Sequence, residues 1–228
     1  MLVLDDEVVP LDLDGPPDTP LRPAGQGGGR SVPVLQPGAA RFVVAYGSNA
    51  SPLRLRDKDL TGQGAVLLPA RVRGWVAAFE ARRTGYGAVP LTFVPSAGAV
   101  TDTWVLGLPA ALFPRLDRSE GRVPDGPPVE REPDDADHRR APPGAYQLGR
   151  VGDVEVADRF LLRGALAYLP GPWTLVQITD DGAWRTWPDH DQAAAAAHVD
   201  RGGEARPAPP VGEPVLGDWP ETPLLPRR

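Results

Sequence analysis

The chain has 228 residues, a formal net charge of −6 and no cysteine. That length fits one domain with long extensions. The negative charge argues against a nucleic-acid-binding protein, and the lack of cysteine excludes a thiol nucleophile, a cysteine-ligated zinc and disulfides. The acidic first residues and the absence of a long apolar run predict neither a signal peptide nor a transmembrane helix, so we expect a cytoplasmic protein.

Proline and glycine account for 29 and 26 residues and crowd into three stretches of the chain. The first stretch predicts a Pro/Gly-rich N-terminal arm at 1–40, part of which packs in extended form. Residues 122–144 are acidic and proline-rich, and they predict either an exposed loop or an ordered lid. We therefore expect a folded domain over 41–200 that contains the insertion 122–144, followed by a Pro-rich C-terminal tail at 201–228.

The first half of the expected domain alternates apolar runs with turn signals. A strand at 42–45 leads into Tyr-Gly-Ser-Asn at 46–49, and a helix is expected to begin at Ser51, whose hydroxyl caps it, with Pro52 at its first position. A short helix is also expected to end just before Gly121. Between the two helices, β-branched and aromatic residues predict strands at 66–72, 75–79, 91–95 and 103–108.

In the second half, strands are predicted at 146–148, 154–157, 165–169, 173–178 and 183–187. The last two flank Asp-Asp-Gly at 180–182, which is a hairpin turn signal. The alanine-rich stretch 190–199 predicts a helix. Many short strands with a few short helices predict an α+β fold built on a small mixed β-barrel-like sheet.

Two short segments carry the chemistry, the turn at 46–49 and the sequence Leu-Asp-Arg-Ser-Glu-Gly at 116–121. Gly47 lets the backbone approach a ligand closely, and the free N–H groups of the next helix favour a carboxylate there. Glu120 lies at the end of its own helix, where a carboxylate is placed to accept and then donate a proton. The two segments together predict one active site.

Each segment alone also has an ordinary structural explanation. A Gly-Ser-Asn turn after a strand is common, and a glutamate before a helix-ending glycine is usually a solvated surface residue. Asp117, three residues before Glu120, either shares its face of the helix or pairs with Arg115 or Arg118. The presence of both segments in one chain, with a series of strands between them, favours the functional interpretation.

The two segments resemble motifs of the γ-glutamylcyclotransferase family. Tyr-Gly-Ser-Asn after an apolar strand is similar to the family's substrate loop, and Leu-Asp-Arg-Ser-Glu-Gly is similar to its Leu-Asp-x-x-Glu-Gly, whose Glu is the catalytic acid/base. Between them, Leu-Thr-Phe-Val-Pro-Ser at 91–96 and Trp-Val-Leu-Gly at 104–107 resemble two of the family's strands. The resemblance covers residues 41–121 and extends weakly to Tyr168.

The resemblance implies a γ-glutamylcyclotransferase-like fold and a cofactor-independent enzyme that converts a γ-glutamyl amide into 5-oxoproline and an amino acid or amine. It also implies that Glu120 is the general acid/base and that no metal takes part. The expected partner is a small γ-glutamyl substrate, with neither nucleic acid nor a membrane involved. The residues expected to bind the substrate are Tyr46, Gly47, Ser48, Asn49 and, by analogy with the family's downstream tyrosine, Tyr146.

The sequence also departs from the family's pattern. Ala50 stands where the family usually has Leu, and the insertion at 122–144 precedes Tyr146. Asn49 argues mildly against the glutathione-specific and γ-glutamylamine branches. Two alternatives stay open: a non-catalytic binding or structural protein whose Pro-rich arms dock a partner, and an enzyme of specialised metabolism that removes a γ-glutamyl group.

Other groups of side chains have simpler interpretations. We expect solvated pairs beside local acids at Arg82-Arg83 and Arg139-Arg140. Core positions are expected for Trp173, Trp184 and Trp187. We expect no metal site among Asp189, His190, Asp191 and His198. The acidic residues there are expected to begin a helix and to complement its dipole.

Overall fold

The computed structural model describes residues 1–5, 7–14, 21–24, 40–122, 144–217 and 219–227. Most of the predicted insertion at 122–144, including Arg139-Arg140, and much of the predicted arm at 1–40 lie outside the described residues. The boundaries of the domain expected at 41–200 stay a prediction.

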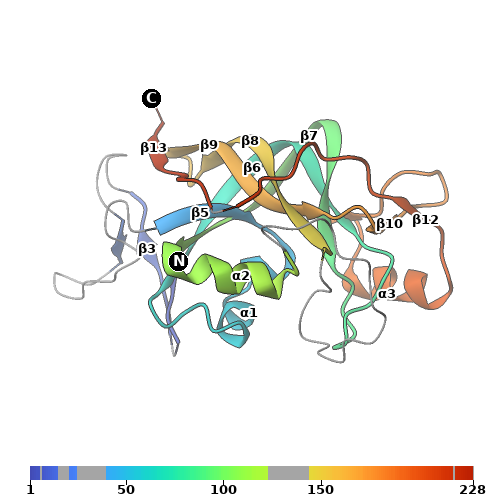
Figure 1. Cartoon of the computed structure of the whole chain (residues 1–228), viewed down its shortest axis with the longest axis horizontal. Helices are drawn as coiled ribbons and strands as arrows, with labels where there is room; N and C mark the ends of the chain where they lie inside the picture. The colour runs from blue at the N-terminus through green and yellow to red at the C-terminus, as the bar shows by residue number, and fades with distance from the viewer. Residues whose placement is uncertain (6, 15–20, 25–39, 123–143, 218, 228) are drawn as a thin grey trace.

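Five strands close into a barrel (Figure 1), which confirms the predicted α+β fold with a mixed barrel-like sheet. Around the barrel, each strand pairs antiparallel with the next until the last one returns to the first. That closing contact is parallel and pairs Val44 with Ala167. In order around the barrel, the strands are β5 (Ala40–Ala45), β7 (Leu91–Pro109), β6 (Ala65–Phe79), β8 (Tyr146–Val156) and β9 (Phe160–Pro170).

The barrel strands are longer than the sequence predicts, because several expected strands merge. The predicted strands at 66–72 and 75–79 form the single strand β6, whose register shifts between Arg73 and Trp75. Gly74 lies at this shift with a φ of +79°, a conformation that glycine adopts at little cost. A bulge of this kind bends a strand without ending its pairing, so a long strand can follow the curve of a barrel.

Short helices follow β5 and β7. After β5 come a 3-10 helix, η2 (Gly47–Ala50), and α1 (Pro52–Asp57). Pro52 occupies the start of α1 as predicted, but the Ser51 side chain makes no capping hydrogen bond, so that part of the prediction is wrong. After β7 come η3 (Ala110–Leu112) and α2 (Phe113–Ser119). Helix α2 ends before Gly121 as predicted, and Gly121 has a φ of +66°.

The third helix and the hairpin before it also follow the prediction. Helix α3 (Gln192–Asp200) begins after Asp191, whose Oδ1 accepts a hydrogen bond of 2.7 Å from the Ala194 amide. The Asp-Asp-Gly turn is closed by a 2.8 Å hydrogen bond from the Thr179 amide to the Ala183 carbonyl. The strands that flank it are short, β10 (Leu175–Gln177) and β11 (Thr186–Trp187).

Residues near both ends of the chain extend the sheet. Strand β1 (Leu2–Val3) pairs with β6 and with β2 (Val8–Val9), and β13 (Leu224–Pro226) pairs with β9. The remaining short strands form two small ribbons: β3 (Leu11–Asp12) with β4 (Arg22–Pro23), and β10 with β12 (Ala205–Pro207). Within the described residues, no helix has the length and apolar character that crossing a membrane requires.

Apolar side chains fill both the barrel and the space between the barrel and its helices. Val44 belongs to one buried cluster, and its neighbour Val43 belongs to the other, because successive side chains of a strand point to opposite faces. The second cluster includes Leu55 of α1 and Phe113 and Leu116 of α2. Full burial of such a side chain stabilises a fold by about 1.5–3 kcal/mol, so these contacts fix both helices against the barrel.

The expected tryptophan core is largely wrong. Trp173 and Trp187 are 67% and 48% exposed, while Trp184 is half-buried against the cluster of Ala78, Val94 and Val176. Trp219 is buried instead, in the Pro-rich C-terminal stretch. Its ring lies 4.2 Å, between centroids, from that of Phe113 on α2.

Candidate functional site

The loop after β5 forms one wall of the candidate site. Gly47 has a φ of +55°, and a Cβ added to it would lie 3.7 Å from the Cβ of Leu91, so the loop backbone runs close to β7. Asn49 is buried, and its amide donates to the Tyr46 carbonyl across 3.3 Å. The predicted loop residues are therefore held in a compact turn.

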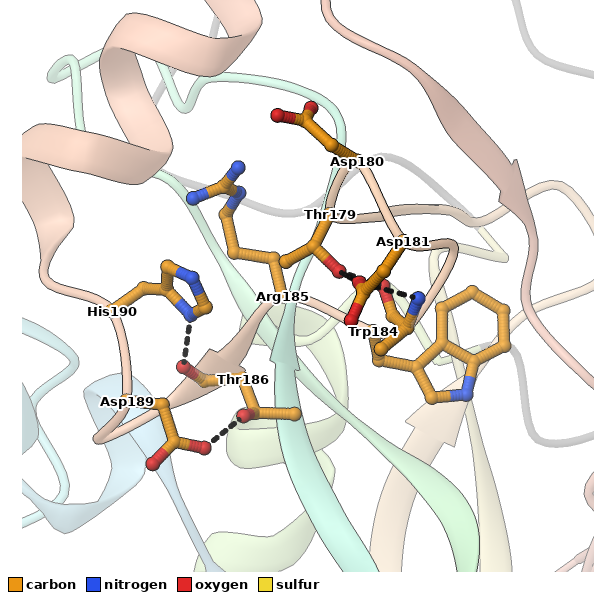
Figure 2. Close-up of a pocket in the computed structure, with 9 residues that line it drawn as sticks. Thr179, Asp180, Asp181, Trp184, Arg185, Thr186, Asp189 and His190 are labelled. Carbon is orange, nitrogen blue, oxygen red and sulfur yellow. Dashed lines mark hydrogen bonds between the residues drawn. The ribbon is translucent and has the colours of Figure 1, made fainter.

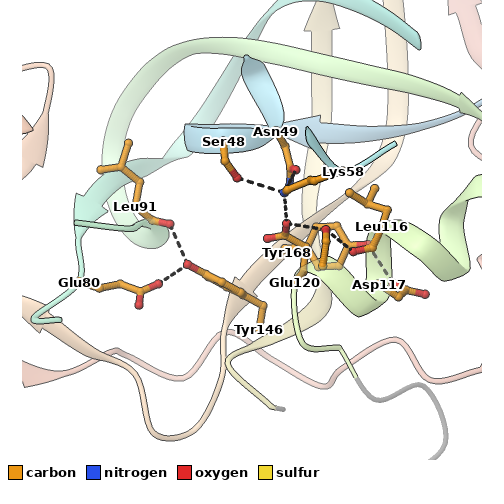
Figure 3. Close-up of polar contacts among 11 residues, drawn as sticks. Ser48, Asn49, Lys58, Glu80, Leu91, Leu116, Asp117, Glu120, Tyr146 and Tyr168 are labelled. Atoms are coloured by element: carbon orange, nitrogen blue, oxygen red, sulfur yellow. Dashed lines mark hydrogen bonds and ion pairs between the residues drawn. The ribbon is translucent and has the colours of Figure 1, made fainter. Parts of the chain in front are cut away.

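Lys58, which ends α1, joins this loop to Glu120 (Figure 3). Its Nζ donates to Glu120 Oε1 at 2.5 Å, to Asn49 Oδ1 at 2.7 Å and to Ser48 Oγ at 3.1 Å. Lys58 is the single lysine of the sequence. The structure thus brings Glu120, Ser48 and Asn49 together around one ammonium group, and the sequence pattern had not assigned Lys58 to the site.

Glu120 is the residue that ends α2, as predicted. Its amide donates to the carbonyls of Leu116 and Asp117, both at 3.1 Å, and its side chain is largely buried. The C-terminal end of a helix carries a partial negative charge that disfavours a carboxylate, and the Lys58 ammonium offsets this effect. The result is a largely buried carboxylate that is fixed beside a cation.

Asp117 does not form the ion pair that one of its two expected alternatives gave it. It pairs neither with Arg115 nor with Arg118, and its Oδ2 lies 2.7 Å from Arg122 Nη1 in a buried ion pair. The carboxylate also accepts hydrogen bonds from Tyr168 Oη at 2.8 Å and from Trp219 Nε1 at 3.1 Å. Asp117 therefore anchors α2 to the barrel and to the C-terminal stretch.

Tyr46 is held on both its ring and its hydroxyl. The ring stacks on Phe93 with centroids 4.2 Å apart, and the hydroxyl donates to the Tyr168 carbonyl. Burial raises the pKa of Tyr46 above its ordinary value, and the charge of Glu120 raises it further. The phenol therefore keeps its proton and fixes the start of the loop.

Tyr146, at the start of β8, lies beside the site and contacts a second buried carboxylate. Its hydroxyl donates to Glu80 Oε1 and lies 3.3 Å from the Leu91 carbonyl oxygen (Figure 3). The other oxygen of Glu80 accepts a 2.7 Å hydrogen bond from Arg82 Nε. The expectation of a solvated pair at Arg82 is wrong, because the carboxylate that Arg82 pairs with, Glu80, is only 2% exposed.

The charges of Glu80 and Glu120 both raise the pKa of Tyr46 and of Tyr146. Burial raises the pKa of Glu80, and the charge of Glu120 adds to this rise, while Arg82 and the Tyr146 hydroxyl oppose it. Burial likewise raises the pKa of Tyr146, followed by the charge of Glu80. The charge of Glu120 thus raises the pKa of Glu80, Tyr46 and Tyr146.

Glu80 was missed in the sequence, and Arg82 was expected in a different environment. The available signal was a glutamate directly after the buried run Ala77–Phe79, where a charged side chain needs a partner. Nothing in the local sequence identifies that partner as Tyr146, which lies 66 positions away.

A depression of the surface lies elsewhere, between the 180–182 turn and the start of α3 (Figure 2). Two of its three acidic side chains are bonded locally: Asp181 accepts from Thr179, and Asp189 accepts from Thr186 Oγ1 at 2.6 Å. The Thr179 hydroxyl lowers the pKa of Asp181. Across the described ranges, no group of three or more His, Cys, Asp or Glu side chains is arranged to hold a metal ion.

Comparisons with known proteins do not assign the chain to a family. No family model matches the chain, and no curated protein matches it. Among solved structures, the crystal structure of YkqA from Bacillus subtilis is similar, with a TM-score of 0.41 and 15% sequence identity. The match covers 71% of this chain and 48% of YkqA, so it spans about half the length of that protein. A similarity at this level assigns neither a family nor a residue role to this chain.

Proposed function

We propose that the protein is an enzyme of γ-glutamylcyclotransferase-like fold that cyclises a γ-glutamyl amide to 5-oxoproline. The observation that carries the proposal is the contact of Lys58 with Glu120 beside the 46–49 loop. A γ-glutamyl group bears an ammonium and a carboxylate on one carbon, and an adjacent carboxylate and ammonium in the protein complement it. The resemblance of residues 41–121 to that family supports the same assignment.

In this reaction two bonds change, and Glu120 carries a proton between two nitrogens. Glu120 accepts a proton from the α-ammonium, and the freed amine attacks the γ-carbonyl carbon of the same molecule. The new carbon–nitrogen bond closes a five-membered ring and leaves a negative charge on the carbonyl oxygen. The bond to the leaving nitrogen then breaks as Glu120 returns its proton to that nitrogen. The ring nitrogen loses its second proton to solvent, and the released amine takes one up.

Binding contributes mainly by folding the substrate onto itself. The Lys58 ammonium holds the α-carboxylate, while Ser48 Oγ and Asn49 Oδ1 accept from the α-ammonium. The substrate's charges replace the contacts that Lys58 and Glu120 make with each other in the unliganded protein. Because the attack is intramolecular, holding this geometry removes much of the entropic cost of ring closure.

The experiment measures 5-oxoproline release from a panel of γ-glutamyl amino acids, glutathione and γ-glutamylamines. Wild type is compared with Glu120→Gln, which keeps the shape of the side chain and removes the base. Glu155→Gln is the matched control, because Glu155 pairs with Arg73 and Arg227 rather than with a residue of the site. We expect release by wild type and by the control, and a loss of at least about a hundredfold in Glu120→Gln.

The preferred leaving group in the panel would identify the substrate class. Equal release by wild type and Glu120→Gln would contradict the role of Glu120. A folded wild-type protein that releases nothing from any member would contradict the enzyme assignment and favour a non-catalytic binding protein.

A further inference from the structure

Tyr168, near the end of β9, contacts both walls of the candidate site. Its main-chain carbonyl oxygen accepts the hydrogen bond that the Tyr46 hydroxyl donates at the start of the 46–49 loop. Its own hydroxyl donates to Asp117 Oδ1 on α2 at 2.8 Å (Figure 3). The loop and α2 are therefore joined through a single residue, by its backbone on one side and by its side chain on the other.

The barrel holds Tyr168 in place. Tyr168 lies opposite Leu148 of β8, and the residue before it, Ala167, pairs with Val44 where the barrel closes. Its side chain is only 2% exposed. Burial raises the pKa of the Tyr168 phenol, and the charge of Asp117 raises it further, so the phenol keeps the proton that it donates. Tyr168 is therefore a fixed point to which both walls are attached.

Asp117 connects this fixed point to Glu120 through the backbone of α2. The Asp117 carbonyl oxygen accepts from the Glu120 amide at 3.1 Å and from the Arg122 amide at 2.9 Å, so it closes the turn that carries Glu120. The Asp117 carboxylate accepts from Tyr168, Arg122 and Trp219. Of these three donors, Tyr168 is the one that lies in a barrel strand and also contacts the loop, so it relates the position of Glu120 to that of the loop.

We propose that Tyr168 is a positioning residue that sets the spacing between the 46–49 loop and the Glu120 carboxylate. This inference rests on the proposed cyclotransferase function. In that reaction the loop holds the substituents of the α-carbon, and Glu120 has to reach two nitrogen atoms of the same molecule, so the spacing determines the rate. A displacement of about 1 Å in such a geometry costs about a hundredfold in rate. Tyr168 acts through Asp117, because its hydroxyl is bonded to that carboxylate and its side chain is buried.

The variant Tyr168→Phe removes the link to α2 and keeps the main-chain carbonyl that Tyr46 contacts. We expect its kcat to fall about tenfold, because Glu120 is held less closely in its position. The KM should change less than about twofold, since the loop and Lys58 still hold the substrate. A wild-type kcat, or a loss that lies mainly in KM, would overturn the proposal.

The variant Tyr46→Phe breaks the same connection from the other side, and it protects the test against misfolding of Tyr168→Phe. It removes the hydroxyl that bonds the Tyr168 carbonyl and leaves the contact between Tyr168 and Asp117 in place. Its kcat should also fall about tenfold. The two contacts act in series, so the double variant should have about the kcat of either single variant. Losses that multiply would reveal two independent structural contributions and would contradict the proposal, as would a Tyr46→Phe enzyme with the wild-type kcat.

Two control variants separate positioning from a general loss of stability. Trp219→Phe removes another donor to the Asp117 carboxylate, one that comes from the C-terminal stretch rather than from the barrel, and its kcat should fall less than that of Tyr168→Phe. Thr101→Val removes a hydroxyl that donates to the Trp75 carbonyl at 2.7 Å between β7 and β6, and it should keep the wild-type kcat. A loss of kcat in either control equal to that in Tyr168→Phe would refute the positioning role.

Amide hydrogen exchange tests the inference without measuring activity. The Arg122 amide is bonded to the Asp117 carbonyl, so its exchange reports how firmly the end of α2 is held. Exchange of this amide should be about tenfold faster in Tyr168→Phe, as for the loss of one hydrogen bond to a charged group, and unchanged in Thr101→Val. An unchanged rate in Tyr168→Phe would overturn the proposal. Failure of the cyclotransferase function itself would appear as folded wild-type protein with no Glu120-dependent release, whatever the exchange rates.

Discussion

Lys58 Nζ lies 2.5 Å from Glu120 Oε1, although the two residues are 62 positions apart in the chain. Their side chains are 14% and 10% exposed, so the pair is largely shielded from water and is screened little by salt. The contact joins the end of α1 to the end of α2, and it also brings Ser48 and Asn49 of the loop to the same ammonium group.

The charge of Lys58 is expected to be necessary for activity. In Lys58→Met the α-carboxylate of the substrate loses its cation, and kcat/KM should fall by about tenfold or more, as for one hydrogen bond between charged groups. Lys58→Arg, which keeps the charge, should retain more activity than Lys58→Met. Steady-state release of 5-oxoproline provides the measurement, and equal activity of Lys58→Met and wild type would contradict the assignment.

Because Lys58 is the single lysine, chemical modification tests the same point without mutation. Acetylation removes its charge, whereas reductive methylation retains it. Acetylation should inactivate the wild-type protein more strongly than methylation does. The amine of Met1 also reacts, and acetylated Lys58→Arg is the control for that reaction.

Asp117 is expected to be important for stability. Asp117→Asn leaves the buried Arg122 without its counter-charge, and breaking a buried ion pair costs about 3–5 kcal/mol in the free energy of unfolding. The control Asp102→Asn breaks the exposed pair with Arg71 and should cost less than about 1 kcal/mol. Urea unfolding followed by circular dichroism measures both, and similar losses for the two variants would contradict the prediction.

Gly171 is expected to tolerate no side chain. A Cβ there would lie 2.0 Å from the carbonyl oxygen of Gly144 and 2.9 Å from that of Ala145. Backbone must move to relieve this overlap, so Gly171→Ala should destabilise the protein by about 1–3 kcal/mol or more. Gly62→Ala is the control, because its nearest neighbour would be Asp5 Oδ2 at 3.7 Å. A thermal midpoint for Gly171→Ala equal to that of the control would show that the backbone at 144–145 moves aside at little cost and would contradict the prediction.

Glu80 and Glu155 are expected to affect the pH dependence of stability in opposite directions. Burial raises the pKa of Glu80 in the folded protein, so its stabilising contribution is full below the unfolded value and is lost as the pH rises through the folded value. The thermal midpoint of wild type relative to Glu80→Gln should therefore fall as the pH rises above about 4.5.

For Glu155 the expected change of stability with pH is opposite to that for Glu80. The hydrogen bond from Arg73 lowers the pKa of Glu155, so its contribution is present above the unfolded value and is lost as the pH falls. The midpoint of wild type relative to Glu155→Gln should fall on acidification. Thermal scans from pH 3 to 8 compare both pairs, and parallel trends for the two glutamates would refute the assignment of their environments.

Features set by neighbouring residues were predictable from the sequence. The start of α1 at Pro52 and the end of α2 before Gly121 depend on the local backbone alone, and both were predicted correctly. The barrel-like sheet followed from the number and composition of the strands. The lengths of the strands could not be predicted, because a glycine such as Gly74 can either end a strand or bend it. In this protein the strand continues past Gly74, because the barrel closes around it.

Features set by distant residues were not predictable in this way. Composition favoured a core position for Trp173, but the burial of an aromatic ring depends on what packs over it. Trp173 is exposed, and the buried tryptophan is Trp219, which packs on Phe113. The predicted loop and Glu120 do meet, but they meet at Lys58, which lies 62 positions from Glu120. Glu80 meets Tyr146 across 66 positions. The roles of Glu120 and of the loop residues stay predictions until activity is measured.

The anchoring of α2 by Trp219 has a consequence for biosynthesis. Trp219 lies 102 positions after Asp117, and Thr222, which bonds the Phe42 backbone, lies 180 positions after Phe42. At the usual translation rate of about 5–20 residues per second, Asp117 is made about 5–20 s before its tryptophan partner. The nascent chain therefore carries α2 through a period in which Phe113 lacks the ring of Trp219 that packs against it in the folded protein.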